Sequence, residues 1–466
     1  MVFSSNFFLF CFLPIVLVIY YLLKEKYKNV FLLLASLFFY FWGEEKSIAI
    51  IVTSILINYF MGLFIYYIKW DNLKKIGLIL AIALNIGLLF YFKYYNFFIT
   101  SINDIVGTNI TISNVALPIG ISFFTFSGVS YVVDLYRRKV PAQKNIIKVA
   151  LYISFFSKLT AGPIVRYIDI ADQIDKRKET IEKFVEGICR FVGGLAKKII
   201  LANCVGIIAD EIFNAPYSQH SISTVWLGII CYTLQIYFDF SGYSDMAIGL
   251  GKMFGFDFLE NFNLPYISSS IKEFWRRWHI SLSSFFRDYV YIPLGGSRKG
   301  NVYFNLLIVF LLTGLWHGES WNFIAWGLWH GFFVVIERMN SEHQLIKIKL
   351  PKLLQHMGTT LVVMIGWVMF RANTLQYAIG YIGRMFGINK ADHIYFQTGY
   401  YLDAYRIFVI ILSIIASLGL FTQINKKLME YKYYTFIRNI FTIVIFFLCI
   451  IYVMNATYNP FIYFRF

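Results

Sequence analysis

The chain has 466 residues, of which 58% are hydrophobic and only 15% are charged, and its mean hydropathy is +0.62. Too little polar surface remains to cover a water-soluble globule, so the composition excludes an ordinary soluble domain and predicts an all-α protein that crosses a membrane several times. The net charge of +16 could suit nucleic acid. Its basic residues lie in short loops between apolar runs, however, which indicates membrane orientation and no nucleic-acid partner.

Twelve apolar runs are candidate membrane crossings, although several are shorter than the roughly 20 residues that a helix needs to span the hydrocarbon core. They lie near residues 7–23, 30–43, 47–68, 76–92, 115–136, 184–208, 222–250, 303–317, 322–338, 357–370, 405–421 and 439–455. The first run lacks a basic n-region and a small-residue cleavage site, so we expect a retained span rather than a signal peptide. A further run at 149–165 is interrupted by Lys158 and the Gly162–Pro163 pair, which predicts a re-entrant segment.

The charge of the loops predicts which side of the membrane each one faces. Lysine and arginine are concentrated in residues 24–28, 69–75, 137–148, 251–302, 338–352 and 425–438, whereas 44–46 and 210–220 are not basic. The basic loops all fall on the cytoplasmic side if the 149–165 run does not cross and both termini lie outside the cytoplasm.

The stretch from Ile271 to Gly331 places a basic, tryptophan-rich segment directly before an apolar run that ends in Trp-His-Gly. At 100° per residue, seven apolar side chains of this segment fall in an arc of about 120°. They are Phe274, Trp275, Trp278, Leu282, Phe285, Phe286 and Tyr289. This pattern predicts one amphipathic helix that lies along the cytoplasmic surface of the membrane.

Three of the seven histidines, His279, His317 and His330, lie in this stretch. An imidazole at membrane depth is costly and therefore a candidate functional group. His317 is the best candidate for a general base, since neutral imidazole can accept a hydroxyl proton near physiological pH. The alternative is a structural histidine packed between tryptophans. His279 could face a channel or the lipid head groups, and we expect His330 to be a core residue.

Charged residues in and beside the apolar runs allow both structural and functional interpretations. Asp239 and Asp245 lie inside the 222–250 run, where we expect ion pairs with the arginines of 276–298 rather than acid–base catalysis. Arg276, Arg277 and Arg298 could bind the phosphates of a cytoplasmic donor, or equally contact anionic lipid.

The sequence contains no G-x-S-x-G, H-E-x-x-H, Walker A or zinc-ligand spacing. This excludes the usual soluble hydrolase, metalloprotease and ATPase classes and predicts no metal site. The five cysteines are odd in number and have no C-x-x-C spacing, so they indicate no disulfide framework.

Several motifs together resemble the membrane-bound O-acyltransferase (MBOAT) family. The resemblance is to its bacterial branch with the alginate O-acetyltransferase membrane subunit and, more distantly, to the teichoic-acid D-alanyl transfer protein. The motifs are VFSSNFFLFCFLPIVLVIYY, LPIGISFFTFSGVSYVVDLYR, AGPIVRY, YFDFSGYSDMAIGLGKMFGFDFLENFNLPY, EFWRRWHISLSSFFRDYVYIPLGGSR and GLWHGESWNFIAWGLWHG. One departure is Ser157-Lys158 before the Ala-Gly-Pro turn, where the family pattern has a proline nearby.

The resemblance implies a single membrane-embedded domain, 1–466, built as a ring of about 11–12 transmembrane helices with re-entrant and amphipathic helices. Residues 1–114 would be N-terminal helices, 115–340 the catalytic core, and 341–466 the C-terminal helices and tail. It implies acyl transfer across the bacterial cytoplasmic membrane, with His317 catalytic and reachable from both sides, and with His279 also needed. Acetyl-CoA would be the donor, no cofactor would be bound, and an extracytoplasmic SGNH-type transferase would pass the acyl group to a polysaccharide.

The C-terminal sequence NPFIYFRF is similar to the F-x-Y-x-x-F motif of the small protein that partners the D-alanyl system, with Phe461, Tyr463 and Phe466 in the pattern. The resemblance implies that Tyr463 carries the acyl group covalently. The alternative is an aromatic anchor at the membrane interface.

Two other functions fit the sequence. One is D-alanyl transfer from a carrier protein to teichoic acid, for which a small acidic carrier would dock on the basic cytoplasmic face. The other is a non-enzymatic exporter of polysaccharide or lipid. Exporters of this kind often contain paired inverted repeats, whereas this chain has only a short Gly-Leu-Trp-His-Gly echo at 314–318 and 327–331.

Overall fold

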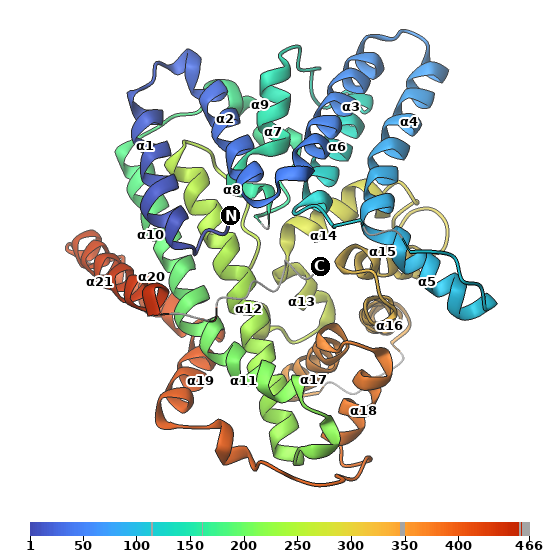
Figure 1. The fold of residues 1–466 in the computed structure, drawn as a ribbon, viewed down its shortest axis with the longest axis vertical. Helices are drawn as coiled ribbons and strands as arrows, with labels where there is room; N and C mark the ends of the chain where they lie inside the picture. Colours follow the sequence, from blue (N-terminus) through green and yellow to red (C-terminus); the bar gives the residue numbers. More distant parts are fainter. Residues whose placement is uncertain (113–114, 161, 345–349, 456–457, 459–466) are drawn as a thin grey trace. The chain divides into compact units, whose positions relative to one another are not determined.

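The computed structural model describes residues 1–112, 115–160, 162–344, 350–455 and 458. These residues form helices and connecting loops without a β-strand, which confirms the predicted all-α class. The chain divides into two compact units, whose helices are labelled in Figure 1. Unit 1 is Met1–Phe191 with Ser244–Leu259, and unit 2 is Val192–Tyr243 with Glu260–Phe466. Helices α10 (Ile181–Ala196) and α12 (Ile222–Met253) contribute residues to both.

Unit 1 contains the N-terminal helices. Their bounds are α1 Leu13–Leu22, α2 Glu25–Gly43, α3 Ile48–Tyr67, α4 Asp71–Leu89, α5 Tyr95–Val106, α6 Ile121–Tyr136, α7 Ile146–Ser154, α8 Phe156–Leu159 and α9 Tyr167–Lys176. Helices α3, α4 and α6 pack against one another. Buried Asn58 on α3 and Asn85 on α4 exchange two amide hydrogen bonds of 3.0 Å. Gly128 on α6 leaves room for the Asn58 amide, because a Cβ there would collide with it.

The run at 149–165 is broken into short pieces, as its lysine and Gly-Pro pair predict. Helix α7 ends at Ser154, and the four-residue α8 carries Lys158. The Lys158 ammonium is buried, donates to the Ser127 hydroxyl at 3.0 Å and lies 4.5 Å from the centre of the Tyr152 ring. These contacts fix irregular backbone that would otherwise be costly inside an apolar body.

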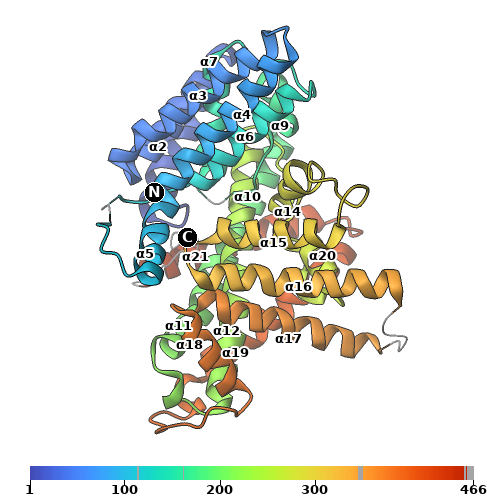
Figure 2. The ribbon, with the colours of Figure 1, turned by 90° about the vertical axis from the view of Figure 1, so that its right-hand side faces the viewer.

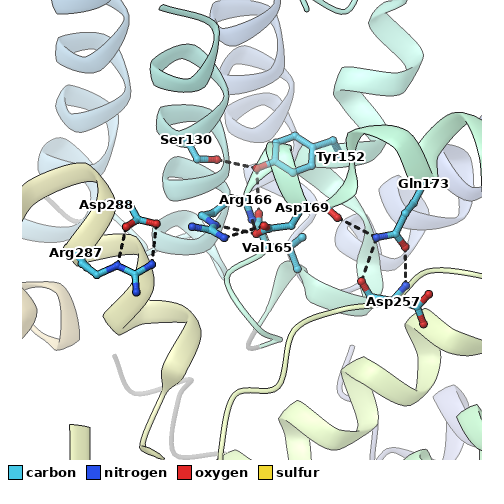
Figure 3. A network of polar contacts seen from close by, with 9 residues as sticks. All are labelled: Ser130, Tyr152, Val165, Arg166, Asp169, Gln173, Asp257, Arg287 and Asp288. Atoms are coloured by element: carbon cyan, nitrogen blue, oxygen red, sulfur yellow. Dashed lines mark hydrogen bonds and ion pairs between the residues drawn. The ribbon is translucent and has the colours of Figure 1, made fainter. Parts of the chain in front are cut away.

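Polar contacts also hold the start of α9 (Figure 3). The Tyr152 hydroxyl contacts the Ser130 hydroxyl at 2.9 Å and donates to the Val165 carbonyl at 3.0 Å. One residue further on, the Arg166 guanidinium forms two hydrogen bonds of 2.8 Å with Asp169. A bidentate arginine–carboxylate pair fixes the orientation of both side chains as well as their distance, so it stabilises the first turn of α9.

Unit 2 holds the histidine-containing stretch. Its helices are α11 Asn203–Asn214, α13 Ile271–Arg277, α14 Ile280–Phe286, α15 Val302–His317, α16 Trp321–His343, α17 Lys352–Arg371, α18 Leu375–Met385, α19 Ala404–Ser417, α20 Leu420–Leu428 and α21 Tyr434–Asn455, with the π-helical turns η4 Lys197–Ala202 and η7 Arg287–Tyr291. Helices α15, α16 and α17 lie side by side (Figure 2).

The Gly-Leu-Trp-His-Gly echo has a packing explanation. Its first glycines, Gly314 on α15 and Gly327 on α16, face each other across the helix pair. A Cβ on Gly314 would lie 3.2 Å from the Gly327 Cα, and one on Gly327 would lie 3.1 Å from the Gly314 Cα. Small residues at matched positions let two helix backbones touch in a membrane protein. The repeat therefore marks a close contact between α15 and α16, one turn before His317 and His330.

Six helices of the described residues are long and apolar enough to cross a membrane, or seven if the bent pair α19 and α20 is one span. The twelve apolar runs predicted more crossings. The difference arises because three runs form apolar helices of only 10 to 17 residues, among them Val302–His317, and because α2 and α16 are not among the six. At 1.5 Å per residue, α15 is about 24 Å long, which is short for a hydrocarbon core of about 30 Å.

Candidate active site

The predicted continuous amphipathic helix is broken at His279. Helix α13 ends at Arg277 and α14 begins at Ile280, and His279 between them has left-handed backbone angles with φ +44°. The prediction of a single helix was wrong because residues 261–263 compete for its hydrogen bonds. The Ile280 amide donates to the Asn261 carbonyl and the Asn263 amide donates to the Arg277 carbonyl, both at 2.9 Å.

Asn261 fixes the orientation and the tautomer of His279. Its side-chain oxygen accepts from the Ser281 amide at 3.2 Å and from the Ser281 hydroxyl at 2.8 Å. A backbone amide can only donate, so the same atom must accept from His279 Nδ1, which lies at 3.1 Å. The proton of the neutral ring is therefore on Nδ1, and Nε2 carries the lone pair.

His279 is fully buried, between α13 and α14 and outside the six long apolar helices. Burial lowers the pKa of His279 to about 3, so its ring stays neutral at physiological pH. A neutral ring with a fixed tautomer can accept a hydrogen bond at its unprotonated nitrogen.

The apolar arc of the segment packs on protein. Six of its seven members are buried: Phe274, Trp275, Trp278, Leu282, Phe285 and Phe286. The ring of Trp275 lies 5.6 Å from that of Trp326, and the ring of Trp278 lies 4.9 Å from that of Trp367. The arc is thus a core-facing surface of unit 2, and the position of the segment along the cytoplasmic surface of the membrane stays a prediction.

His317 is the last residue of α15, one turn beyond the close contact at Gly314. Its ring lies 4.9 Å from that of Trp326 on α16 and 5.1 Å from that of Phe370 on α17. Three helices therefore position it. Only 2% of the residue is exposed, so a reacting group must approach through the side chains that surround it.

The two histidines border the same indole. The ring of Trp316 lies 5.7 Å from His279 and 4.8 Å from His317, and the ring of Phe240 covers His279 at 4.7 Å. The structure thus brings together two of the predicted site residues that are separated by 38 positions in the chain. The surrounding aromatic rings exclude water, so an electrostatic interaction between a reacting group and either histidine is stronger there than in water.

His330 lies one turn beyond the Gly327 contact on α16. Its ring is 5.1 Å from Trp275 and 5.2 Å from Trp326, and both of its nitrogens lack a hydrogen-bond partner among the described residues. A Cβ on Gly366 would lie 2.5 Å from His330 Nε2, so this glycine makes room for the ring. His330 is a buried core residue, as expected, but the hydrogen bonds expected of a satisfied histidine are not seen among the described residues.

The buried aspartates form ion pairs, but with cations other than those predicted. Asp239 pairs with Lys198 at 2.6 Å and Asp245 pairs with Arg190 at 2.6 Å. Helix α10 and the η4 turn present these cations to α12, and pairing with the arginines of 276–298 stays a prediction. The Lys198 and Asp239 side chains are each only 2% exposed.

The three predicted donor-binding arginines differ in their surroundings. Arg276 and Arg298 are exposed, whereas Arg277 pairs with Glu273 at 2.9 Å and donates to the Asn263 carbonyl at 3.1 Å. Arg276 and Arg277 belong to α13, and Arg298 follows η7 in a turn. Their role in donor binding stays a prediction.

Tyr463 lies outside the described residues, and its role stays a prediction. Asn261 is a site residue that sequence reasoning missed. The motif LENFNLPY contains it, but nothing in its spacing pairs it with a histidine 18 residues later. Only the folded backbone brings the two together.

Comparisons with known proteins agree with this architecture. Residues 37–379 match the model of the MBOAT, membrane-bound O-acyltransferase family. The chain is 43% identical over 423 residues to the probable alginate O-acetylase AlgI of Pseudomonas aeruginosa, covering 87% of this chain and 80% of that protein. It is 36% identical to the peptidoglycan O-acetyltransferase of Helicobacter pylori, covering 84% and 80%. Identity to the teichoic acid D-alanyltransferase of Bacillus subtilis is 30%, over 48% and 61%.

The family match and the named relatives place this protein in the acyltransferase class. The chain is a member of the membrane-bound O-acyltransferase family.

Proposed function

We propose that this acyltransferase moves an acetyl group from a cytoplasmic thioester, most simply acetyl-CoA, across the cytoplasmic membrane. The group then becomes an O-acetyl ester on an extracytoplasmic or cell-envelope polysaccharide. Support comes from relatives named for O-acetylation of a polymer, alginate in one case and peptidoglycan in the other. The D-alanyl alternative has less support, since the D-alanyltransferase match covers only about half of this chain.

In this proposal His317 is the general base. Its ring takes the proton of an acceptor hydroxyl while the hydroxyl oxygen attacks the thioester carbonyl. The new C–O bond forms, the C–S bond breaks, and the imidazolium returns the proton to the departing thiolate. The products are the acyl ester and the free thiol, and the step requires neither a metal nor a cofactor.

His279 is the second histidine of the proposed site. Because Asn261 holds the proton on Nδ1, the Nε2 lone pair is the acceptor that this ring offers to a reacting group. We assign it the task of holding the acceptor or the donor in place beside Trp316, whose ring also touches His317.

The proposed donor site uses Arg276, Arg277 and Arg298 for the phosphates of the donor. Exposed Arg276 and Arg298 are free to bind phosphate, and Arg277 would share its guanidinium with Glu273. Replacing Arg276 and Arg298 by alanine should raise the KM for acetyl-CoA with little change in kcat. If the KM of this variant is unchanged and its yield depends on anionic lipid, both arginines would be assigned to lipid binding instead.

On the outer side, Tyr463 would carry the acetyl group as a phenolic ester, and an SGNH-type transferase would pass it to the polymer. Both termini would then lie outside the cytoplasm, as the loop charges predict. Tyr463→Phe removes only the hydroxyl and should abolish polymer acetylation with normal membrane abundance. Unchanged acetylation would return Tyr463 to the role of an aromatic anchor.

One observation carries the proposal: His279 and His317 lie buried against one indole in a chain that is 43% identical to an O-acetylase over most of its length. The test is mass spectrometry of envelope polysaccharides from cells with and without this chain. A gain of acetyl esters that depends on the chain would support the proposal. A gain of D-alanyl esters would support the alternative, and no ester at all would contradict both.

A further inference from the structure

A cluster of charged and phenolic groups lies on unit 2 where the C-terminal helix ends. Tyr458, three residues beyond α21, directs its hydroxyl to the Asp210 carboxylate on α11 at 2.5 Å. The other oxygen of Asp210 accepts from the Arg371 guanidinium at 2.6 Å. Asn203 on α11 donates to the backbone carbonyl of Tyr458 at 3.3 Å. Both the side chain and the backbone of Tyr458 are therefore held.

The partial burial of this cluster stabilises the hydrogen bond between Tyr458 and Asp210. The Arg371 side chain is 9% exposed and the Asp210 side chain 16%. Burial and the Asp210 carboxylate raise the pKa of the Tyr458 hydroxyl, so the phenol keeps its proton and donates it. A charge-assisted hydrogen bond between partly buried groups is stronger than one between neutral groups in water.

The cluster adjoins the residues that line the histidine site. Arg371 directly follows Phe370, whose ring lies 5.1 Å from His317. Asp239, which acts on the Tyr458 hydroxyl through its charge, directly precedes Phe240, whose ring lies 4.7 Å from His279. Arg371 and Asp239, whose charges act on the Tyr458 hydroxyl, are thus the chain neighbours of two rings that pack on the histidines.

We propose that Asp210 and Arg371 form a docking site for the protein's own C-terminal segment, and that Tyr458 is the positioning residue that anchors this segment at the histidine site. For its consequence in catalysis, this inference rests on the proposed function of Tyr463. Tyr463 lies five positions after Tyr458, and a chain of five residues extends about 17 Å at most. The anchor therefore limits where the proposed acyl carrier can go.

The contact itself is testable by hydrogen exchange of the full-length protein in detergent, followed in the peptic peptide that contains Tyr458. Tyr458→Phe and Asp210→Asn should each speed exchange of that peptide by about tenfold to a hundredfold, the factor expected for loss of a hydrogen bond to a charged group. Because the two groups form one contact, the double variant should exchange no faster than the more affected single variant.

Two matched controls are available in the same region. Tyr452→Phe removes a phenol of α21 that pairs with the Tyr405 hydroxyl at 3.0 Å, and Glu211→Gln removes the carboxylate next to Asp210. Neither should change exchange of the Tyr458 peptide. Equal exchange in Tyr458→Phe and Tyr452→Phe would overturn the docking site, whatever the activity of the two variants.

Polymer acetylation measured on the same variants separates the inference from the proposed function. Faster exchange together with at least tenfold less acetylation supports an anchor that serves catalysis. Faster exchange with unchanged acetylation supports the docking site and contradicts the carrier role of the tail.

Discussion

His279 is the site residue whose structural and chemical roles can be separated by substitution. Its left-handed backbone costs about 1–2 kcal/mol for most residues, but asparagine adopts this conformation readily. The amide nitrogen of an asparagine would also take the place of Nδ1 and donate to Asn261 in the same way. His279→Asn therefore keeps the turn and the hydrogen bond and removes only Nε2 and the outer part of the ring.

The expected magnitudes follow from these contacts. His279→Ala loses the hydrogen bond, about 1 kcal/mol, and a buried ring packed against Phe240 and Trp316, about 2–4 kcal/mol. Its free energy of unfolding should fall by about 3–5 kcal/mol. His279→Asn should lose about 1–2 kcal/mol and remain folded in the membrane.

The activity of His279→Asn then reports on Nε2. If this nitrogen holds or accepts a proton, acetylation should fall by at least about a hundredfold. The assay pairs acetyl content of the polymer with thermal unfolding of the purified protein followed by size-exclusion chromatography. A folded His279→Asn variant with full activity would refute the chemical role and leave His279 a structural residue.

Three further predictions concern packing and polar contacts. Gly314→Ala should destabilise the protein by about 1–3 kcal/mol and reduce acetylation by displacing His317. Gly358→Ala is the control, because its added Cβ would have no neighbour within 4 Å, and it should be neutral or slightly stabilising in thermal unfolding. Asn261→Asp can accept the same three hydrogen bonds and should fold, whereas Asn261→Leu leaves buried donors unpaired and should lower membrane abundance. Asn58→Leu should cost about 2–3 kcal/mol, because the buried Asn85 oxygen loses its donor while the Asn85 nitrogen keeps its hydrogen bond to the Ala81 carbonyl. Adding Asn85→Leu should recover most of that loss, which a double-mutant cycle of unfolding free energies would measure.

The sequence predicted the class of fold and marked His279 and His317 as candidate site residues, because both depend on local patterns. Long apolar runs specify helices in a membrane, and the Trp-His pair at 316–317 marks the end of one of them. The broken run at 149–165 was also visible, since Lys158 and the Gly-Pro pair interrupt its apolar pattern.

What the sequence could not predict depends on contacts between distant residues. The helical period at 271–289 was real, but the backbone of residues 261–263 breaks the helix at His279. The cations that pair with Asp239 and Asp245 come from α10 and η4, because the position of those helices decides which charges meet. Asn261 and Tyr458 carry no distinguishing local signal, and their roles become visible only when their partners are brought beside them.

The role of His317 is tested most directly by His317→Gln, expressed at the same membrane abundance as the natural protein, with acetyl content of the envelope polysaccharide measured by mass spectrometry. We predict acetylation no higher than in cells that lack the chain, because no other group replaces the lost base. Acetylation near the natural level in that variant would contradict the account and leave His317 as a packing residue between α15, α16 and α17.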